Sequence, residues 1–260
     1  MCGIKIFLTV ILFFNLDEVG DASGAMFVSS VGSKIYSANI NPALLSYLNN
    51  NNLGIQYLRI YNLVPQTKIV LNYRNFTIGL SSLGVGNYQE VTLKFGVGLR
   101  INNEFSYGLG VKNRFLFLTE NLKIFRPAID LGVVFSPQVI SSKQLRLIKF
   151  AGLLENLNYL VIKDPNNYLA VKFGLGAHLA LNENFILSTE FKKASDKTEL
   201  NFGTEFKLLP SLALRVGCKT NPVLYSAGLG VNYKRFEFDY CLRYHPRLKE
   251  TNIFSLSFQF

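Results

Sequence analysis

The sequence predicts an all-β fold: a transmembrane antiparallel β-barrel of about 14 strands with a short N-terminal helical plug. Three observations predict it. The 260 residues are 49% hydrophobic and 17% charged, yet no apolar run reaches the roughly 18 residues of a membrane helix. From Leu53 onward, apolar and polar residues alternate, as in strands with two different faces. The apolar rows continue for about 9 to 11 residues, the length of a tilted membrane strand.

The chain begins with the layout of a secretory signal peptide. One lysine precedes the apolar run Ile6 to Leu16, and small residues follow at Gly20, Ala22 and Gly24. We therefore expect a signal peptide over residues 1–23, with cleavage between Ala22 and Gly24. An uncleaved anchor is the alternative, although the run is short for a span.

Residues 24–52 do not alternate, and we expect them to form a plug segment ahead of a barrel over residues 53–260. Asn41 followed by Pro42 and Ala43 fits a helix N-cap with proline at the first helical position. The apolar helix that follows, ending at Asn49 to Asn52, needs a place to be buried. The lumen of the barrel offers one.

Fourteen segments with strand character follow the plug. The even-numbered strands end in tight turns such as Arg74-Asn75 and Lys234-Arg235. Because outer-membrane barrels have their short turns on the periplasmic side, this places both termini there. The stretch from Pro137 to Gln144 is too long for this rule. The predicted strands are 53–63, 67–74, 75–83, 88–101, 104–118, 125–136, 145–154, 168–181, 184–193, 197–208, 210–219, 223–234, 235–245 and 250–260.

The polar parity of these strands carries charges, which would cost about 2–4 kcal/mol each at the centre of a lipid face. We therefore expect the apolar parity, including Phe95, Val97 and Leu99, to face lipid and the charges to face the lumen. The predicted lumen-facing residues are Lys94, Arg100, Lys112, Arg114, Asp130, Lys172, His178, Glu190, Lys192, Glu205, Lys207, Arg215, Lys219, Lys234, Glu237, Asp239 and Arg243. A soluble secreted β-sandwich, with these faces reversed, is the alternative.

The C-terminus alternates aromatic and aliphatic residues and ends on phenylalanine. Phe254, Leu256, Phe258 and Phe260 resemble the C-terminal signal that the barrel-assembly machinery of bacterial outer membranes reads. Behind a signal peptide, this strand predicts location in the bacterial outer membrane. Tyrosines near the strand ends, such as Tyr57, Tyr73 and Tyr233, would supply the interfacial aromatic girdle.

The N-terminal residues resemble the FadL-like outer-membrane superfamily, in particular its PorV/PorQ branch. The resemblance rests on Gly24-Ala25-Met26-Phe27-Val28 followed by Asn41-Pro42-Ala43-Leu44-Leu45. It implies a fourteen-strand barrel with an N-terminal hatch. The chain is shorter than the fatty-acid transporters of the superfamily, which favours the PorV/PorQ branch.

Two sets of glycines allow more than one interpretation. Four strands carry Gly-x-Gly pairs on the lumenal parity, which indicates either clearance for the plug or curvature of the wall: Gly96/Gly98, Gly108/Gly110, Gly174/Gly176 and Gly228/Gly230. In the third strand, Gly84 and Gly86 follow Ser81-Ser82. FadL-like transporters release substrate sideways at a kink in that strand, whereas an ordinary extracellular loop is the simpler interpretation.

We expect no enzyme chemistry, cofactor or metal site. His178 and His245 fall at opposite ends of distant strands, so they cannot share a catalytic site. Two histidines without clustered cysteines or carboxylates do not make a metal site. Cys218 and Cys241 fall on opposite faces of the sheet, so we expect no disulfide between them.

The function expected is that of a non-enzymatic PorV/PorQ-type barrel, an accessory of protein secretion or surface attachment. What the resemblance implies is association with type IX secretion. The alternative is a FadL-like transport barrel for small hydrophobic or anionic solutes. Expected partners are outer-membrane lipid, the barrel-assembly machinery and secretion-system proteins. Nucleic acid is not expected, because the lysines and arginines are spread over nearly every strand rather than gathered in one patch.

Overall fold

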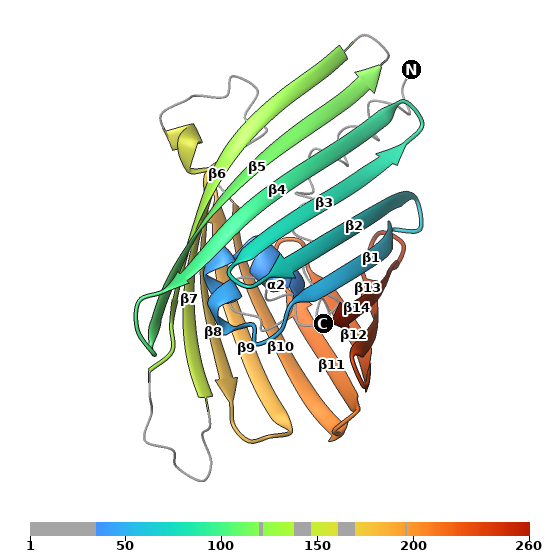
Figure 1. The fold of residues 1–260 in the computed structure, drawn as a ribbon. Coiled ribbons are helices and arrows are strands. Elements are labelled where there is room, and N and C mark those ends of the chain that lie inside the picture. The colour runs from blue at the N-terminus through green and yellow to red at the C-terminus, as the bar shows by residue number, and fades with distance from the viewer. Residues whose placement is uncertain (1–34, 120–121, 138–146, 161–169, 196) are drawn as a thin grey trace.

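The computed structural model describes residues 35–119, 122–137, 147–160, 170–195 and 197–260. The predicted signal peptide (1–23) and the first part of the predicted plug (24–34) lie outside these residues. Within them, the strands form a closed antiparallel barrel with two short helical segments in its interior (Figure 1). The predicted fold class is confirmed.

Alternation of apolar and polar residues is the reason the chain forms strands here, because each strand then presents one face to each side of a closed wall. Every predicted segment corresponds to one strand. The strands are β1 (Asn52–Ile60), β2 (Val64–Tyr73), β3 (Phe76–Val85), β4 (Tyr88–Arg100), β5 (Phe105–Thr119), β6 (Leu122–Phe135), β7 (Leu147–Glu155), β8 (Lys172–Ala180), β9 (Phe185–Ala194), β10 (Lys197–Leu209), β11 (Leu212–Lys219), β12 (Leu224–Tyr233), β13 (Phe236–Tyr244) and β14 (Thr251–Gln259).

Each strand pairs with its neighbours in the chain, and β14 closes the barrel onto β1. The closing register runs from Asn52 opposite Gln259 to Arg59 opposite Asn252. We call the end where β1 begins and β14 finishes the terminal end, and the opposite end the far end. Closure leaves no exposed sheet edge between these two strands, as a wall in lipid requires.

The pairing of β6 with β7 is short and confined to the terminal half of β6. It runs from Leu131 opposite Leu154 to Phe135 opposite Phe150. Beyond it, Asn158 in the 3₁₀ helix η4 (Leu157–Leu160) replaces a strand partner. Its side-chain oxygen accepts a hydrogen bond from the Ile129 N–H at 3.1 Å, and its amide donates to the Pro127 carbonyl at 3.1 Å.

The two faces of the wall are reversed relative to a soluble protein. Phe95 and Leu99 are 45% and 42% exposed on the outer face, and the large apolar residues of nearly all strands join them in a belt. Lysines and carboxylates on the other parity, among them Lys94 and Glu190, are buried inside. A continuous apolar belt on a closed barrel is the surface of an outer-membrane protein, and it excludes the soluble sandwich.

No helix within the described residues is long and apolar enough to span a bilayer. The connections at the terminal end are mostly tight, and Arg74 and Lys234 adopt positive φ angles of 51° and 55° in their turns. Lys234 was predicted on a strand, but β12 ends one residue earlier, at Tyr233. Of the long stretch predicted between strands six and seven, residues 138–146 lie outside the described residues.

Candidate functional site: the plugged lumen

The plug consists of the helix α2 (Ile35–Ile40) and the 3₁₀ helix η3 (Pro42–Tyr47), joined at Asn41. Asn41 caps η3, because its side-chain oxygen accepts the Ala43 N–H at 3.2 Å and Pro42 occupies the first turn. The sequence indicated this cap but not α2. Ala43, Leu44 and Leu45 are buried in one cluster with Val134 and Ala151 of the wall.

Glycines of the wall let the plug backbone approach closely. A Cβ atom at Gly98 or Gly108 would overlap Pro42, and one at Gly132 would overlap the Asn41 side chain. A Cβ at Gly174 would meet only ordinary contacts, the nearest at 3.7 Å. The clearance interpretation of the Gly-x-Gly pairs therefore holds for some strands and not for others. On β4 and β5 the pairs give clearance for the plug, whereas on β8 they do not.

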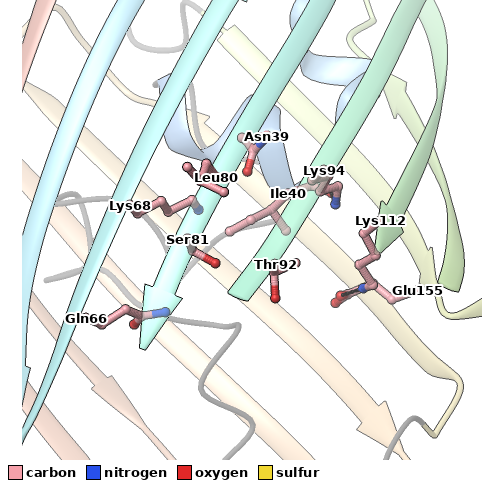
Figure 2. A pocket seen from close by; sticks show the side chains of 11 residues that line it. Asn39, Ile40, Gln66, Lys68, Leu80, Ser81, Thr92, Lys94, Lys112 and Glu155 are labelled. Carbon is pink, nitrogen blue, oxygen red and sulfur yellow. Dashed lines mark hydrogen bonds and ion pairs between the residues drawn. The ribbon is translucent and has the colours of Figure 1, made fainter. Parts of the chain in front are cut away.

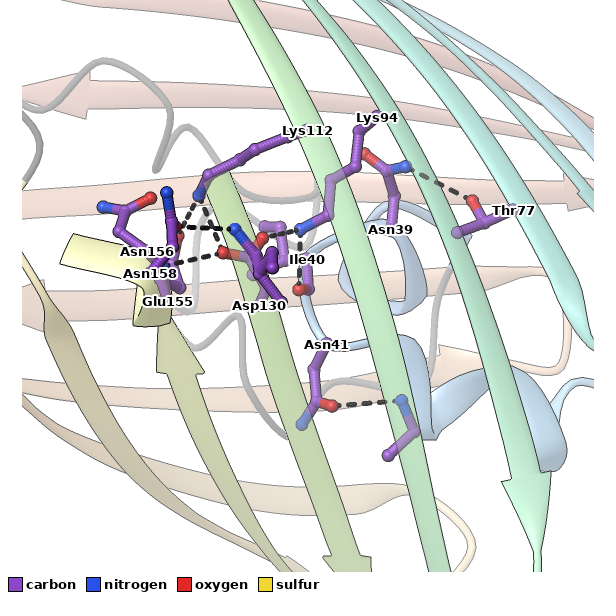
Figure 3. A network of polar contacts seen from close by, with 12 residues as sticks. Asn39, Ile40, Asn41, Thr77, Lys94, Lys112, Asp130, Glu155, Asn156 and Asn158 are labelled. Atoms are coloured by element: carbon purple, nitrogen blue, oxygen red, sulfur yellow. Dashed lines mark hydrogen bonds and ion pairs between the residues drawn. The ribbon is translucent and has the colours of Figure 1, made fainter. Parts of the chain in front are cut away.

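An ion network ties the plug to the wall and to a loop (Figure 3). Asp130 is fully buried and lies 2.7 Å from the Lys94 ammonium and 3.1 Å from the Lys112 ammonium. Lys94 also donates to the Ile40 carbonyl at the end of α2 (3.1 Å), and Lys112 lies 3.1 Å from Glu155. The Asn156 N–H donates to Asp130 at 3.0 Å. One carboxylate thus connects the plug, three strands and the start of the β7–β8 connection.

A small polar cavity of about 50 Å³ lies between α2 and the wall, lined by Asn39, Gln66, Lys68, Thr92 and Lys94 among others (Figure 2). The Gln66 side-chain oxygen is buried and has no hydrogen-bond partner among the described residues. A cavity of this size holds about one or two water molecules. It therefore provides room for water under the plug rather than for a solute.

Two cations hold the last turn of the plug near the terminal end. The Arg100 guanidinium and the Lys149 ammonium lie 5.0 Å and 4.7 Å from the centre of the Tyr47 ring. The Tyr47 hydroxyl donates to the Glu104 carbonyl at 3.3 Å. Cation–π contacts of this kind contribute about 0.5–1 kcal/mol each at exposed sites. They fix the plug at its second end.

A second charge cluster occupies the wall away from the plug. Arg215 pairs with Glu205 at 2.6 Å and with Asp239, and Glu237 lies 3.9 Å from it. Arg215 stands directly opposite Glu205 in the register of β10 and β11. Cross-strand neighbours on one face approach more closely than residues two apart on a strand.

Most of the predicted lumen-facing residues are buried or half-buried on the inner face of the barrel. Arg100 and Lys234 are exposed, because they lie at the terminal end where strands give way to turns. The buried ones are Lys94, Lys112, Asp130, Lys172, His178, Glu190, Lys192, Glu205, Arg215 and Asp239, and the half-buried ones are Arg114, Lys207, Lys219, Glu237 and Arg243. The residues Phe254, Leu256, Phe258 and Phe260 lie on the outer face of β14 or at its end.

The lumen also contains an apolar cluster that sequence analysis missed. It lies at the far end, on the inward parity of β1 to β5, β13 and β14, and consists of Leu58, Ile60, Tyr61, Val64, Leu83, Tyr88, Leu116, Cys241 and Ile253. The signal was present in the sequence. Near the far end, strands such as β1 carry apolar residues on both parities, with Tyr57 outside and Leu58 inside.

The histidines and cysteines within the described residues form no recognisable reactive centre. His178 Nδ1 lies 2.9 Å from the Ser188 hydroxyl, but both side chains are buried, which fits polar packing better than a nucleophile open to substrate. Cys218 and Cys241 are free thiols. Among the described residues, no group of three or more His, Cys, Asp or Glu side chains could hold a metal ion.

The third strand has no break that would open the wall. It pairs with β2 from Tyr73–Phe76 to Gln66–Leu83 and with β4 along its whole length. Gly84 lies within the β3–β4 pairing, and Gly86, with φ of 57°, forms the turn. The glycines of this region therefore serve the hairpin, as in the simpler interpretation.

Comparisons with solved structures agree with this architecture. The chain is similar to the CymD monoaromatic hydrocarbon channel (TM-score 0.60, 13% identity, covering 95% of this chain and 98% of that one). It is similar to the Pseudomonas putida toluene transporter TodX (0.61, 11%, 90% and 96%) and to a Pseudomonas aeruginosa FadL homologue (0.59, 12%, 93% and 98%). No protein-family profile and no curated protein sequence matches. By its fold, the chain is a closed outer-membrane β-barrel of fourteen antiparallel strands, similar in architecture to these channels.

Proposed function

We propose that this barrel is a channel for small hydrophobic molecules, including those that carry an anionic group. The observation that supports it most is the apolar cluster inside the lumen at the far end. A lumen that served only to hold charges would have no reason to bury Leu58, Leu116 and Ile253 there. Proteins of the same fold include a hydrocarbon channel and a toluene transporter.

In this proposal the far end faces the exterior, and a solute meets the apolar cluster before it meets the plug. Beneath the cluster, buried lysines and arginines outnumber carboxylates in the lumen, and this positive charge would favour a solute that carries an anionic group. Passage then requires the plug to move, because the glycines of β4 and β5 hold its backbone against the wall. The plug is the gate of the channel.

Uptake of radiolabelled toluene by cells that express the chain and lack their own channels tests the proposal. We expect uptake above that of cells with an empty vector. Leu58→Gln, which puts an amide into the apolar cluster, should reduce it several-fold. The matched control Ser226→Gln puts the same amide on the lumenal face of β12, and uptake should persist. Equal uptake with and without the protein would refute the proposal.

A second candidate is the accessory of protein secretion that the PorV/PorQ resemblance implies. The firm attachment of the plug through Asp130, Lys94 and the glycine cradle, formed by Gly98, Gly108 and Gly132, favours a barrel that stays closed. In that case no solute is taken up, and detergent-solubilised protein brings down proteins of the secretion machinery, identified by mass spectrometry. A pull-down that recovers bound lipid or fatty acid and no protein companion argues against it.

A further inference from the structure

The outer face of β8 to β11 carries a groove within the apolar belt. Its volume is about 570 Å³. The outward side chains in its centre are small (Ala177, Thr189 and Cys218), and larger ones such as Phe202 and Leu187 border it. The register places Ala177 opposite Thr189, Thr189 opposite Phe202, and Phe202 opposite Cys218. The groove therefore crosses four strands, with small outward residues on β8, β9 and β11 and the Phe202 ring of β10 between Thr189 and Cys218.

This groove has the size and chemistry of a site for one apolar chain. Its volume falls within the about 300–1,000 Å³ typical of small-ligand sites. Leu187 and Phe202, at 37% and 47% exposure, belong to the outer belt rather than to the lumen. Any molecule in the groove must come from the membrane around the barrel, and the abundant apolar chains there are the acyl chains of lipids.

A cation lies above the groove on the same face. Lys193 is exposed and has the same outward parity as Thr189, four residues further along β9 toward the far end. At about 3.3 Å per residue, this puts it about 13 Å from the groove. A lysine on the lipid-facing side is costly at the membrane midplane but nearly free at the interface. Lys193 therefore lies at headgroup level, where it attracts phosphate.

We propose that the groove and Lys193 together bind one anionic membrane lipid, with an acyl chain in the groove and the phosphate group at Lys193. The charge of Lys193 complements the headgroup. The site lies on the outside of the wall, so it is independent of the plug and of any transport through the lumen.

The test is photocrosslinking in lipid nanodiscs with phosphatidylglycerol that carries a diazirine on one acyl chain, followed by peptide mapping. We expect crosslinks to concentrate in β8 to β11 by several-fold over the belt at β2 to β4. Thr189→Leu, which fills the groove, and Lys193→Ala should each remove the enrichment. Their matched controls, Thr67→Leu on the outer face of β2 and Arg59→Ala at the far end of β1, should retain it.

Three results would overturn the proposal. Crosslinks spread evenly around the belt would show that the groove selects nothing. Equal enrichment with the neutral lipid phosphatidylcholine would remove the role of Lys193. Native mass spectrometry that reveals a dimer joined through β8 to β11, without retained lipid, would assign the groove to a second copy of the chain. Retention of one phosphatidylglycerol per protein, lost in Lys193→Ala, supports it.

Discussion

At the scale of single residues, Asp130 is the point on which the plug depends. A buried carboxylate must be compensated, and Lys94, Lys112 and the Asn156 N–H do so together. Of these three partners of Asp130, Lys94 is the one that also donates a hydrogen bond to the plug, at the Ile40 carbonyl. Its loss should release α2 while leaving Asp130 with two partners. Lys94 is therefore a residue at which the plug can be loosened while Asp130 keeps two partners.

We expect Lys94→Met to increase hydrogen exchange of residues 35–47 and to lower the stability of the plug by about 1.5–3 kcal/mol, the typical contribution of a hydrogen bond to a charged group. Hydrogen-exchange mass spectrometry in detergent measures it. Lys192→Met is the control, because it removes the lysine of a lumenal ion pair with Glu190 (3.3 Å) that does not involve the plug. Equal exchange of the plug in both variants would contradict the role of Lys94.

The glycine cradle gives a second prediction at this scale. Gly108→Ala places a Cβ against Pro42 and Ala43, so the plug must shift, whereas Gly174→Ala meets nothing nearer than 3.7 Å. We expect channel openings in planar bilayers to become more frequent in Gly108→Ala only. The two substitutions are chemically identical and both lie on lumenal strand positions. Similar currents from both variants would mean that the plug does not control the pore.

At the scale of elements, the strands were predictable and the plug only in part. Each strand separates an outer apolar face from an inner polar one, and that period is visible in the sequence. The helix α2 is enclosed on all sides, and Tyr36, Ser37, Ala38 and Asn39 are all buried. A helix buried all round has no amphipathic period, so nothing in the sequence indicated it. Only the Asn41-Pro42 cap gave a local signal.

The last strand carries an element-scale prediction. Phe258 packs against Phe236 with ring centres 5.0 Å apart, and Phe260 stacks on Phe258 at 6.1 Å. Phe260 lies just beyond β14 and is half exposed on the outer surface, so its contribution to the folded barrel is small. We expect Phe260→Ser to reduce the amount of protein in the outer membrane of cells several-fold, because Phe260 is the last residue of the predicted C-terminal assembly signal.

Refolding in detergent separates assembly from stability. Purified Phe260→Ser should refold into detergent micelles as well as the parent chain and unfold at the same temperature. Phe236→Ser, which removes a ring from the same outer surface but leaves the residues of the C-terminal strand unchanged, is the control and should insert normally in cells. Normal insertion of Phe260→Ser would show that this strand does not act as the recognition signal.

At the scale of the whole molecule, the barrel separates three environments: an outer apolar belt, a charged lumen, and an apolar patch inside the far end. The sequence indicated the first two, since they follow from one period of two residues. The third also has a signal, since apolar residues occupy both parities at the strand ends, but an interfacial aromatic girdle gives the same pattern, so the sequence alone did not distinguish the two. Which strands bring Leu58, Leu116 and Ile253 together depends on closure of β14 onto β1.

The balance of charge in the lumen gives the last prediction. Lysines and arginines outnumber carboxylates among the described lumen-facing residues, and Lys68, Arg126 and Lys149 are buried there as well. A variant that lacks residues 35–48 should therefore form an open pore that favours anions, because fixed positive charge raises the local anion concentration. Reversal potentials across a KCl gradient measure the preference, which should weaken at high salt. Lys172→Glu on the lumenal face of β8 should reduce the anion preference, whereas Lys249→Glu, exposed in the β13–β14 loop, should not. A cation-selective pore would mean that the carboxylates around Arg215, rather than the lysines near the plug, line the narrowest part of the lumen.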